Sequence, residues 1–397
     1  MSTNNIYLLT EQNTSRTTLA HIEHEEIHEK EDVFVDGYRI TKPRFPISYQ
    51  PTEASLYLTS SCNFSCSYCY IVPFYKEKLK DELSLLEWKN VLNELMLNGV
   101  RTLKLIGGEV LLYPHLSELI SYADKLGFSG IELTTGGSIK VIKKRLSVLE
   151  EFKKVKAHKI ISISLDSSDK NHHDKERGGH QDVIDGVKFL IEKGFNISLA
   201  SVISKDNADD IENIALLAAE MGVDVIQFNS LVPIFEEQKG KVISETEGIL
   251  ETIESIESLR VKIPKLTIVN RFVPAPNINK EIFNKHKDNK ILAESSLSGC
   301  PAGTREAYIL PDGKLIACPM FIRYPEHQSV KTLKDSTFQD IWENDKAIRS
   351  FRNHLKPASL SESCKSCESS PLCKGGCRAM SHFLSDDVTE QDPRCIF

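Results

Sequence analysis

The chain has 397 residues, of which 40% are apolar and 26% charged, and this composition is typical of a folded protein with one large α/β domain and a smaller one. The net charge of −7 offers no basic surface for extended contact with nucleic acid or an anionic membrane. Because the chain begins without a signal segment and contains no apolar run of spanning length, we expect a cytoplasmic protein without nucleic-acid or membrane partners.

The first 50 residues are expected to form an N-terminal extension, 1–50, with a short helix and a hairpin. The stretch HIEHEEIHEK places His21, His24 and His28 on one helical face, which could suggest a metal site. The glutamates between them favour a solvated face instead. The run VFVDGYRI at 33–40 predicts a hairpin that turns at its Asp-Gly pair.

Residues 51–235 alternate short β-branched or apolar runs with longer segments whose apolar residues recur every three or four positions. Helical candidates include 84–99 and 182–194. The candidate strands are 55–59, 102–106, 130–135, 159–165, 196–203 and 224–231. Six β-α units in series predict an α/β fold with a parallel sheet, a partial (β/α)6 TIM barrel. Its active-site residues are expected in the loops after the strands.

The remaining chain divides into a bridge and a cysteine-rich end. Residues 236–298 are charged and helical, with one strand-like run, KLTIVNRF, at 265–272. Residues 299–397 hold seven of the ten cysteines, and three more lie at 62–69. A reducing compartment disfavours disulfides, so this clustering indicates metal binding or catalysis.

Cys62, Cys66 and Cys69 form a C-x3-C-x2-C motif. Three thiolates can hold a [4Fe-4S] cluster by three irons and leave the fourth iron open, whereas the alternative, zinc, normally takes four ligands. The motif follows the first predicted strand, and its aromatic Tyr68 precedes the last cysteine. In these features it resembles the cluster loop of radical S-adenosylmethionine (radical SAM) enzymes. The resemblance implies that S-adenosylmethionine binds the open iron and is cleaved to a 5′-deoxyadenosyl radical.

Further motifs at successive strand ends are similar to those of radical SAM enzymes. Gly107, Gly108 and Glu109 follow the second strand and resemble the motif that contacts the methionyl amino group, although Val110 replaces the usual proline. Thr135 lies in a Thr-Thr-Gly sequence after the third strand, where the family commonly has Thr-Asn-Gly. The resemblance adds these residues and Tyr68 to the cofactor site.

The stretch SLDSSDKNHHDKERGG after the fourth strand resembles another cofactor-binding segment of the family. It implies that Ser164 and Asp166 lie near the ribose and that Arg177 lies near the methionyl carboxylate. Each also has an alternative, non-functional interpretation, with Asp166 as a helix cap and Arg177 as a surface charge.

The seven C-terminal cysteines are spaced like those of a SPASM domain, a small cysteine-rich domain that binds two auxiliary clusters; a zinc ribbon is the alternative. The resemblance implies three [4Fe-4S] clusters in all. Its outer auxiliary cluster would be held by Cys364, Cys367, Cys373 and Cys395. Its inner cluster would be held by Cys300, Cys318 and Cys377, leaving an open iron or a ligand other than cysteine.

The expected function is that of a radical SAM enzyme, and the leading substrate is a peptide that is crosslinked or oxidised. The alternatives are a small molecule, such as a tetrapyrrole, a sugar or a cofactor precursor, and a sulfatase maturase. Asn270 and Arg271 stand where the maturases carry an aspartate base. An electron carrier is disfavoured, since it needs no SAM-binding motifs. The N-terminal extension is too short for a full leader-binding module, so a separate leader-binding protein is a possible partner, beside a flavodoxin or ferredoxin type reductant.

Overall fold

In a computed structural model of the chain, the described residues are 49–71, 80–273 and 299–397, together with the backbone of four strands nearer the N-terminus. These four strands form an antiparallel sheet in the order β2-β1-β4-β3. Their bounds are β1 Ile6–Glu11, β2 Thr17–His21, β3 Val33–Val35 and β4 Tyr38–Thr41. β3 and β4 pair over the residues of the expected hairpin, and β1 and β2 were not expected. His21, which was expected on a helix with His24 and His28, is instead the last residue of β2; the other two histidines lie outside the described residues.

The main sheet contains the predicted parallel strands, each within two residues of its expected bounds. They are β5 Glu53–Tyr57, β6 Thr102–Ile106, β7 Gly130–Thr135, β8 His158–Ser164, β9 Ile197–Ile203 and β10 Val225–Ser230. Neighbours in the sheet are consecutive in the sequence and parallel, as βαβ connections require. The predicted partial barrel is therefore confirmed.

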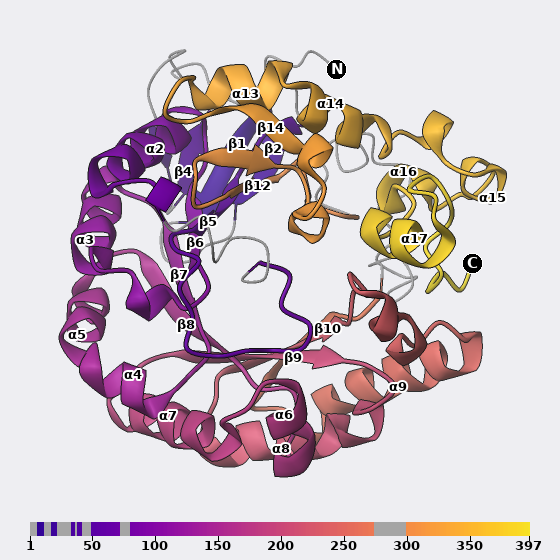
Figure 1. Cartoon of the computed structure of the whole chain (residues 1–397), viewed down its shortest axis with the longest axis horizontal. Coiled ribbons are helices and arrows are strands. Elements are labelled where there is room, and N and C mark those ends of the chain that lie inside the picture. Colours follow the sequence, from indigo (N-terminus) through magenta and orange to yellow (C-terminus); the bar gives the residue numbers. More distant parts are fainter. Residues whose placement is uncertain are drawn as a thin grey trace.

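The helices between these strands form an arc on the outside of the curved sheet (Figure 1). They are α2 Leu85–Leu97, α3 Leu116–Leu126, α4 Ile139–Lys144, α5 Leu146–Lys154, α6 Lys170–Glu176, α7 His180–Glu192, α8 Ile211–Met221 and α9 Thr246–Lys262. Short 3-10 turns are η4 Val110–Leu112, η5 Ala208–Asp210 and η6 Glu236–Lys241. α2 begins at a capping box between Ser84 and Glu87 and buries Trp88 and Leu92 against the sheet, as its sequence pattern predicts.

The sheet extends beyond the six predicted strands at both sides. β11 (Thr267–Arg271) follows α9 and pairs in parallel with β10, so the strand-like run of the bridge is a seventh unit of the sheet. On the other side, β12 (Glu306–Ile309) pairs in parallel with β5. β13 (Lys314–Ile316) and β14 (Gln328–Thr332) continue the sheet in antiparallel fashion. The barrel and the cysteine-rich region therefore share one sheet.

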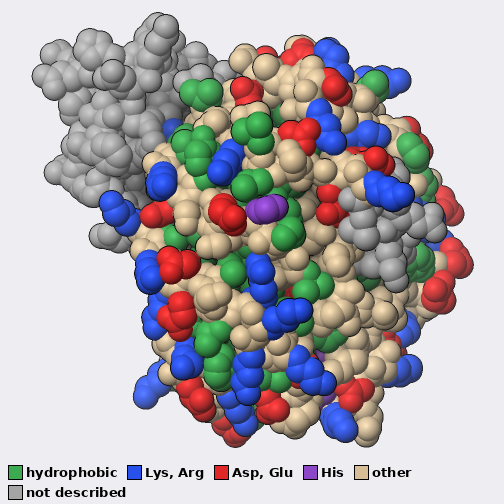
Figure 2. All heavy atoms as spheres, turned by 60° about the vertical axis from the view of Figure 1, so that its left-hand side comes forward, with side chains coloured by type: hydrophobic (Ala, Val, Ile, Leu, Met, Phe, Trp, Pro, Cys, Tyr) green, Lys and Arg blue, Asp and Glu red, His purple; other side chains and the backbone are tan. Residues whose placement is uncertain are grey.

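Short helices complete the C-terminal region, at the top and right of Figure 1. They are η7 Pro319–Phe321, η8 Pro325–His327, α13 Phe338–Asn344, α14 Lys346–Asn353, η9 Pro357–Ser359, α15 Glu362–Lys365, α16 Ser370–Cys373 and α17 Arg378–Ser385. Among the described residues, no helix is both long enough and apolar enough to cross a bilayer. On the face shown in Figure 2, basic and acidic side chains are interspersed, without a field of one sign.

Candidate active site

The first cysteine motif lies in the loop after β5, in the middle of the ring of helices (Figure 1). Burial, together with the charges of Cys66 and Cys69, raises the pKa of the Cys62 thiol to about 11. Burial likewise raises the pKa of Cys66, and Cys69 adds to that shift. Because such charges act on a pKa only at short range, the three thiols are neighbours. A bound metal would favour their thiolate forms and release protons.

Gly107 and Gly108 let the loop after β6 press against the cysteine loop. A Cβ at Gly108 would lie 2.4 Å from the carbonyl oxygen of Ser61, and one at Gly107 would lie 2.8 Å from that of Thr59. The Gly108 amide donates to the Thr59 carbonyl at 2.6 Å, and the next amide donates to Ser61 at 2.8 Å. These positions require glycine for close approach of two backbones, which fits the expected cofactor role of the segment.

Glu109 and Thr135 are buried and tie the loops after β6 and β7 together. The carboxylate accepts hydrogen bonds from the Leu111 amide at 3.0 Å and from the Gly136 amide at 2.8 Å. The Thr135 hydroxyl lies 2.8 Å from both carboxylate oxygens. Burial raises the pKa of Glu109, although these donors oppose the shift. Protein donors thus occupy the carboxylate, and a direct contact to a cofactor would come from the backbone of this segment.

Tyr68, Asp166 and Arg177 form a buried polar chain beside the cysteine loop. The Tyr68 hydroxyl donates to Asp166 and accepts from Nη1 of Arg177 at 2.6 Å. The guanidinium also lies 3.6 Å from Asp166, and its charge lowers the pKa of Cys66 against the effect of burial. Asp166 is only 3% exposed, and its other oxygen accepts from the Val202 amide at 2.9 Å. Asp166 therefore positions Tyr68 and Arg177.

Ser164 is the last residue of β8 and is partly exposed. Its hydroxyl makes no hydrogen bond to another described residue. Among the residues that the resemblance assigns to the ribose, it is the one with an available polar group. The structure therefore brings Tyr68, Asp166 and Arg177 together and leaves Ser164 at the adjoining strand end.

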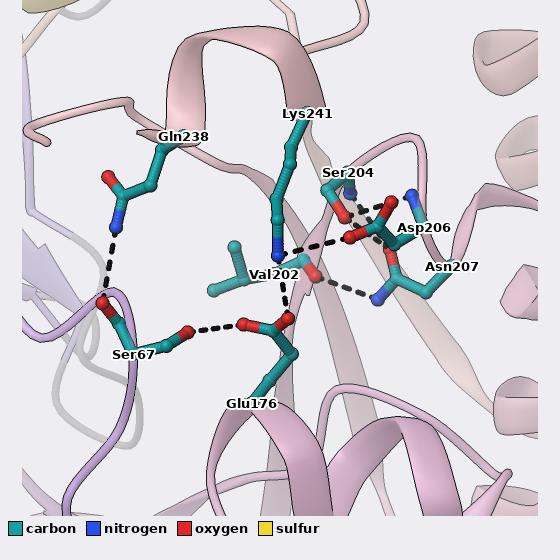
Figure 3. Close-up of polar contacts among 8 residues, drawn as sticks. All are labelled: Ser67, Glu176, Val202, Ser204, Asp206, Asn207, Gln238 and Lys241. Carbon is teal, nitrogen blue, oxygen red and sulfur yellow. Dashed lines mark hydrogen bonds and ion pairs between the residues drawn. The ribbon is translucent and has the colours of Figure 1, made fainter. Parts of the chain in front are cut away.

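A cavity of about 90 Å³ opens next to this chain, at the carboxyl ends of β8 to β10. Figure 3 shows how its rim is held. The Glu176 carboxylate accepts from the Ser67 hydroxyl and pairs with Lys241 at 2.7 Å, and Lys241 also reaches Asp206 at 3.1 Å. Gln238 donates to the Ser67 carbonyl at 3.3 Å. These contacts fasten η6 and the end of α6 to the cysteine loop.

Asn207 organises the opposite wall of the cavity (Figure 3). Its amide nitrogen donates to the carbonyls of Asp166 at 2.7 Å and Val202 at 3.0 Å, and its oxygen accepts from the Ser204 amide at 2.8 Å. With Leu231 beside Val202, the cavity combines apolar walls with fixed polar groups, an arrangement that is common in small-molecule sites.

The C-terminal cysteines form two groups of neighbours. In the first, burial raises the pKa of Cys300 to about 12, with Cys377 adding to the shift, and the pKa of Cys318 is raised by burial and by the other two. In the second, burial raises the pKa of Cys373 to about 12, with contributions from Cys395 and Cys364. Cys367 joins Cys364 through a backbone hydrogen bond of 3.3 Å.

The couplings between thiols run within the sets that the resemblance implies, and Cys367 is linked to its set by the backbone bond to Cys364; the assignment of ligands to clusters stays a prediction. All ten cysteines are free thiols. Among the described residues, no three His, Cys, Asp or Glu side chains converge on a position for a single metal ion. Assignment of iron-sulfur clusters therefore depends on the grouping of thiols and on the family.

A charged network centres on the buried Glu306 of β12. Glu306 accepts from Ser55 at 2.7 Å, from Lys104 at 2.9 Å and from Tyr308 at 3.0 Å. Lys104 also pairs with Glu53 at 2.9 Å. The network joins β12 to β5 and β6 through side chains as well as backbone. Nothing in the sequence predicts it, because residues from distant segments meet only through the pairing of β12 with β5.

Sequence reasoning also missed the rim of the cavity. Gln238 and Lys241 lie in the EEQKGK segment, and Glu176 directly precedes Arg177. The position of Glu176 next to Arg177 in the sequence could have indicated that it lies at the cofactor site. Asn270, at the position of the maturase aspartate, donates to Glu257 at 2.9 Å and accepts from the Phe272 amide at 3.1 Å, so it is held in a structural role.

Comparison with known proteins identifies two regions of the chain. A family model of the radical SAM superfamily matches residues 56–218, and a model of the SPASM iron-sulfur cluster-binding domain matches residues 300–368. The two together cover more than half of the chain. The chain is a radical SAM enzyme with a SPASM domain. Such enzymes bind S-adenosylmethionine, a [4Fe-4S] cluster and auxiliary iron-sulfur clusters, and the cysteine sets described above fit these groups.

Relatives of this radical SAM enzyme include proteins of two kinds. It is 26% identical over 357 residues to an AdoMet-dependent heme synthase of Methanosarcina barkeri, covering 86% of this chain and 95% of the relative. It is 28% identical over 196 residues to the sporulation killing factor maturation protein SkfB of Bacillus subtilis, covering 49% of this chain and 46% of the relative. The relatives therefore differ in substrate class.

Among solved structures, the enzyme resembles Streptococcus suis SuiB bound to its precursor peptide SuiA. The TM-score is 0.73 at 18% identity, and the match covers 88% of this chain and 76% of SuiB. At this identity the likeness shows a shared fold.

Proposed function

We propose that this enzyme modifies a peptide by an oxidative radical reaction. The observation that carries this proposal is the grouping of the cysteines into three sets. One set lies in the loop after β5, and the other two lie in the C-terminal region. The first group is assigned to the SAM-binding cluster, Cys300, Cys318 and Cys377 to an inner auxiliary cluster, and the third group to an outer one. The outer ligands are Cys364, Cys367, Cys373 and Cys395.

A cluster held by Cys62, Cys66 and Cys69, with S-adenosylmethionine bound, would supply a 5′-deoxyadenosyl radical able to take a hydrogen atom from the substrate. Crosslinking removes two hydrogens from the peptide. The second would leave as a proton, released to solvent, and an electron, for which an auxiliary cluster held by the C-terminal cysteines would be an acceptor. The electron that forms the radical would come from a flavodoxin or ferredoxin type reductant.

The chain's own residues would bind and orient the cofactor. Arg177, held by Tyr68 and Asp166, offers its guanidinium to the methionyl carboxylate, and Ser164 offers a hydroxyl to the ribose. The cavity between Val202 and the Gln238 segment would take the adenosine portion. Backbone groups of Gly107 and Gly108 lie against the cysteine loop, where the methionyl amino group is expected.

A peptide substrate is supported by the relationship to SkfB and by the fold shared with SuiB, a protein that binds a precursor peptide. A separate leader-binding protein is proposed as a partner. Cysteines kept as thiols support a cytoplasmic location.

A small-molecule substrate is the second candidate. It is supported by the heme synthase relative, since that likeness extends over 95% of the relative's length. A tetrapyrrole is then the substrate class to test. The structural role of Asn270 gives no support to a sulfatase-maturase reaction that depends on a base at this position.

The test is anaerobic co-expression with any short open reading frame found beside the gene, followed by mass spectrometry of the encoded peptide. We expect a loss of two hydrogen masses per crosslink, and no loss with the matched Cys66→Ala variant. An unchanged peptide mass, with 5′-deoxyadenosine formed only on addition of a tetrapyrrole, would transfer the assignment to the second candidate. Iron analysis should give about twelve irons per chain for three [4Fe-4S] clusters; about four would contradict the auxiliary clusters.

A further inference from the structure

Arg378 is a buried arginine directly after Cys377, at the start of α17, and it is 1% exposed. Its Nη1 donates to the carbonyl oxygens of Val388 and Glu390, both at 2.8 Å. Its Nε and Nη2 are buried without any hydrogen-bond partner. Two donors of a guanidinium thus point into the protein interior unsatisfied, which is costly for a charged group.

The contrast with the other buried arginine near Cys377 is informative. Arg394 is paired with Asp392, at 3.0 Å from Nε to one oxygen and at 2.8 Å from Nη2 to the other. The same Asp392 accepts from the Cys377 amide at 2.7 Å. Among the described residues, no carboxylate lies within ion-pair distance of Arg378; hydrogen bonds from Thr389 and, less strongly, the charge of Arg378 lower the pKa of the exposed Asp387. A buried cation without an ion-pair partner is strongly unfavourable, so an anion is expected beside Arg378.

The inner cysteine group is the anionic partner next to Arg378 in the chain. Arg378 directly follows Cys377, and its charge lowers the pKa of Cys300 against the effect of burial. Gly375 keeps space for the guanidinium, since a Cβ at this residue, whose φ is +80°, would lie 2.6 Å from Nη2 of Arg378. The deprotonated thiols that hold a cluster would supply the missing negative charge.

We propose that Arg378 tunes the inner auxiliary cluster: its two free N–H donors hydrogen-bond the cluster held by Cys300, Cys318 and Cys377 and raise its reduction potential. Reduction adds one negative charge to the cluster, and a buried cation beside it stabilises the reduced form. Arg378 thereby makes the inner cluster the better acceptor of the electron that the substrate loses as its new bond forms. The inference rests on the proposed oxidative function and deepens it.

The test is a redox titration of the fully reconstituted enzyme without substrate, followed by electron paramagnetic resonance. In Arg378→Gln we expect the equilibrium constant for one-electron reduction of the inner cluster to fall at least tenfold. This corresponds to a reduction potential lower by about 59 mV. The other two clusters serve as internal controls and should not shift. Arg378→Lys keeps the charge and should shift much less. Arg349→Gln, a change at an exposed residue of α14, should have no effect.

An inner-cluster potential unchanged in Arg378→Gln would overturn the proposal, and so would an equal shift of all three clusters. Arg378 also supports two carbonyls, so the glutamine variant could lose its inner cluster. Loss in glutamine with retention in lysine would support a requirement for the cation. Loss in both variants would leave Arg378 a packing role only and would reject the proposal. Because no substrate is present, a failure to find peptide modification leaves this result standing.

Discussion

Glu306→Gln tests whether the charged network around Glu306 joins the cysteine-rich region to the barrel strands β5 and β6. Glu306 lies on β12 and accepts from Ser55, Lys104 and Tyr308 over distances of 2.7 to 3.0 Å. Glutamine keeps the length of the side chain but removes its charge and replaces one acceptor oxygen by a donor. Lys104 then keeps its ion pair with Glu53 at 2.9 Å.

The size of the effect follows from the pKa of Glu306. Burial alone would raise it, but Lys104 and the three hydrogen bonds outweigh burial and lower it from 4.5 to about 2. At 1.36 kcal/mol per pKa unit, this corresponds to about 3 kcal/mol. Because Glu53 still balances part of the lysine charge, we expect Glu306→Gln to reduce the free energy of unfolding by about 2 to 3 kcal/mol at neutral pH.

The assay is urea unfolding of the reconstituted enzyme under anaerobic conditions. Asp340→Asn is the matched control, because Asp340 pairs with Lys331 at a similar distance, 2.8 Å, on the surface. It should cause little or no loss, as solvent screens such pairs. A Glu306→Gln variant as stable as the wild type would refute the buried ion pair as a stabilising contact.

The pH dependence has a definite sign. Since folding lowers the pKa of Glu306, its stabilising contribution is complete above about pH 4.5 and is lost as the pH falls towards about 2. The difference between wild type and Glu306→Gln should therefore narrow on acidification across that range. A difference that widens would contradict the sign.

Three further changes probe the cofactor site and a fourth probes the outer cysteine group. Gly108→Ala should remove the SAM-site iron, about four of about twelve atoms, since its Cβ would meet backbone at 2.4 Å; Gly240→Ala, with no atom within 4 Å, should retain all iron. Tyr68→Phe leaves two buried charged partners short of a hydrogen bond, at about 1 to 3 kcal/mol, and should weaken S-adenosylmethionine binding about tenfold in calorimetry; unchanged affinity would argue against the polar chain. Lys241→Met breaks a partly exposed ion pair and should weaken binding at most about fivefold; a complete loss would mean that Lys241 contacts the cofactor. Cys364→Ser should remove the outer-cluster signal alone, and loss of the inner signal would contradict the grouping.

The fold could be predicted because its signals are local. Alternating apolar runs and helical spacing specify β5 to β10 and the helices between them, and a βαβ order allows few arrangements. The place of β12 could not be predicted. Its four residues carry no local signal that they pair with β5, which lies about 250 residues earlier in the chain, rather than only with the adjacent β13. β11 was found as a strand, but its membership of the barrel sheet depends on a similar non-local contact.

The site divides in the same way. The spacing of the cysteines can be recognised in the sequence because sets of cluster ligands are built from short loops. The assignment of individual cysteines to clusters stays a prediction. Glu109 and Asp166 were expected near the cofactor, and the structure shows their carboxylates engaged by protein donors. Arg378 looked like any charged residue of an amphipathic helix, and only its burial distinguishes it.

The pairing of β12 with β5 limits how the enzyme can be divided. β5 leads into the cysteine loop at its carboxyl end and has β6 on one side and β12 on the other. Removal of the C-terminal region would convert β5 from an interior strand into an edge strand with unpaired amides and carbonyls. Such edges recruit other chains and aggregate. A truncated radical SAM core of this protein would therefore be an aggregation-prone fragment, and domain-shuffling experiments should retain β12 to β14 with the barrel.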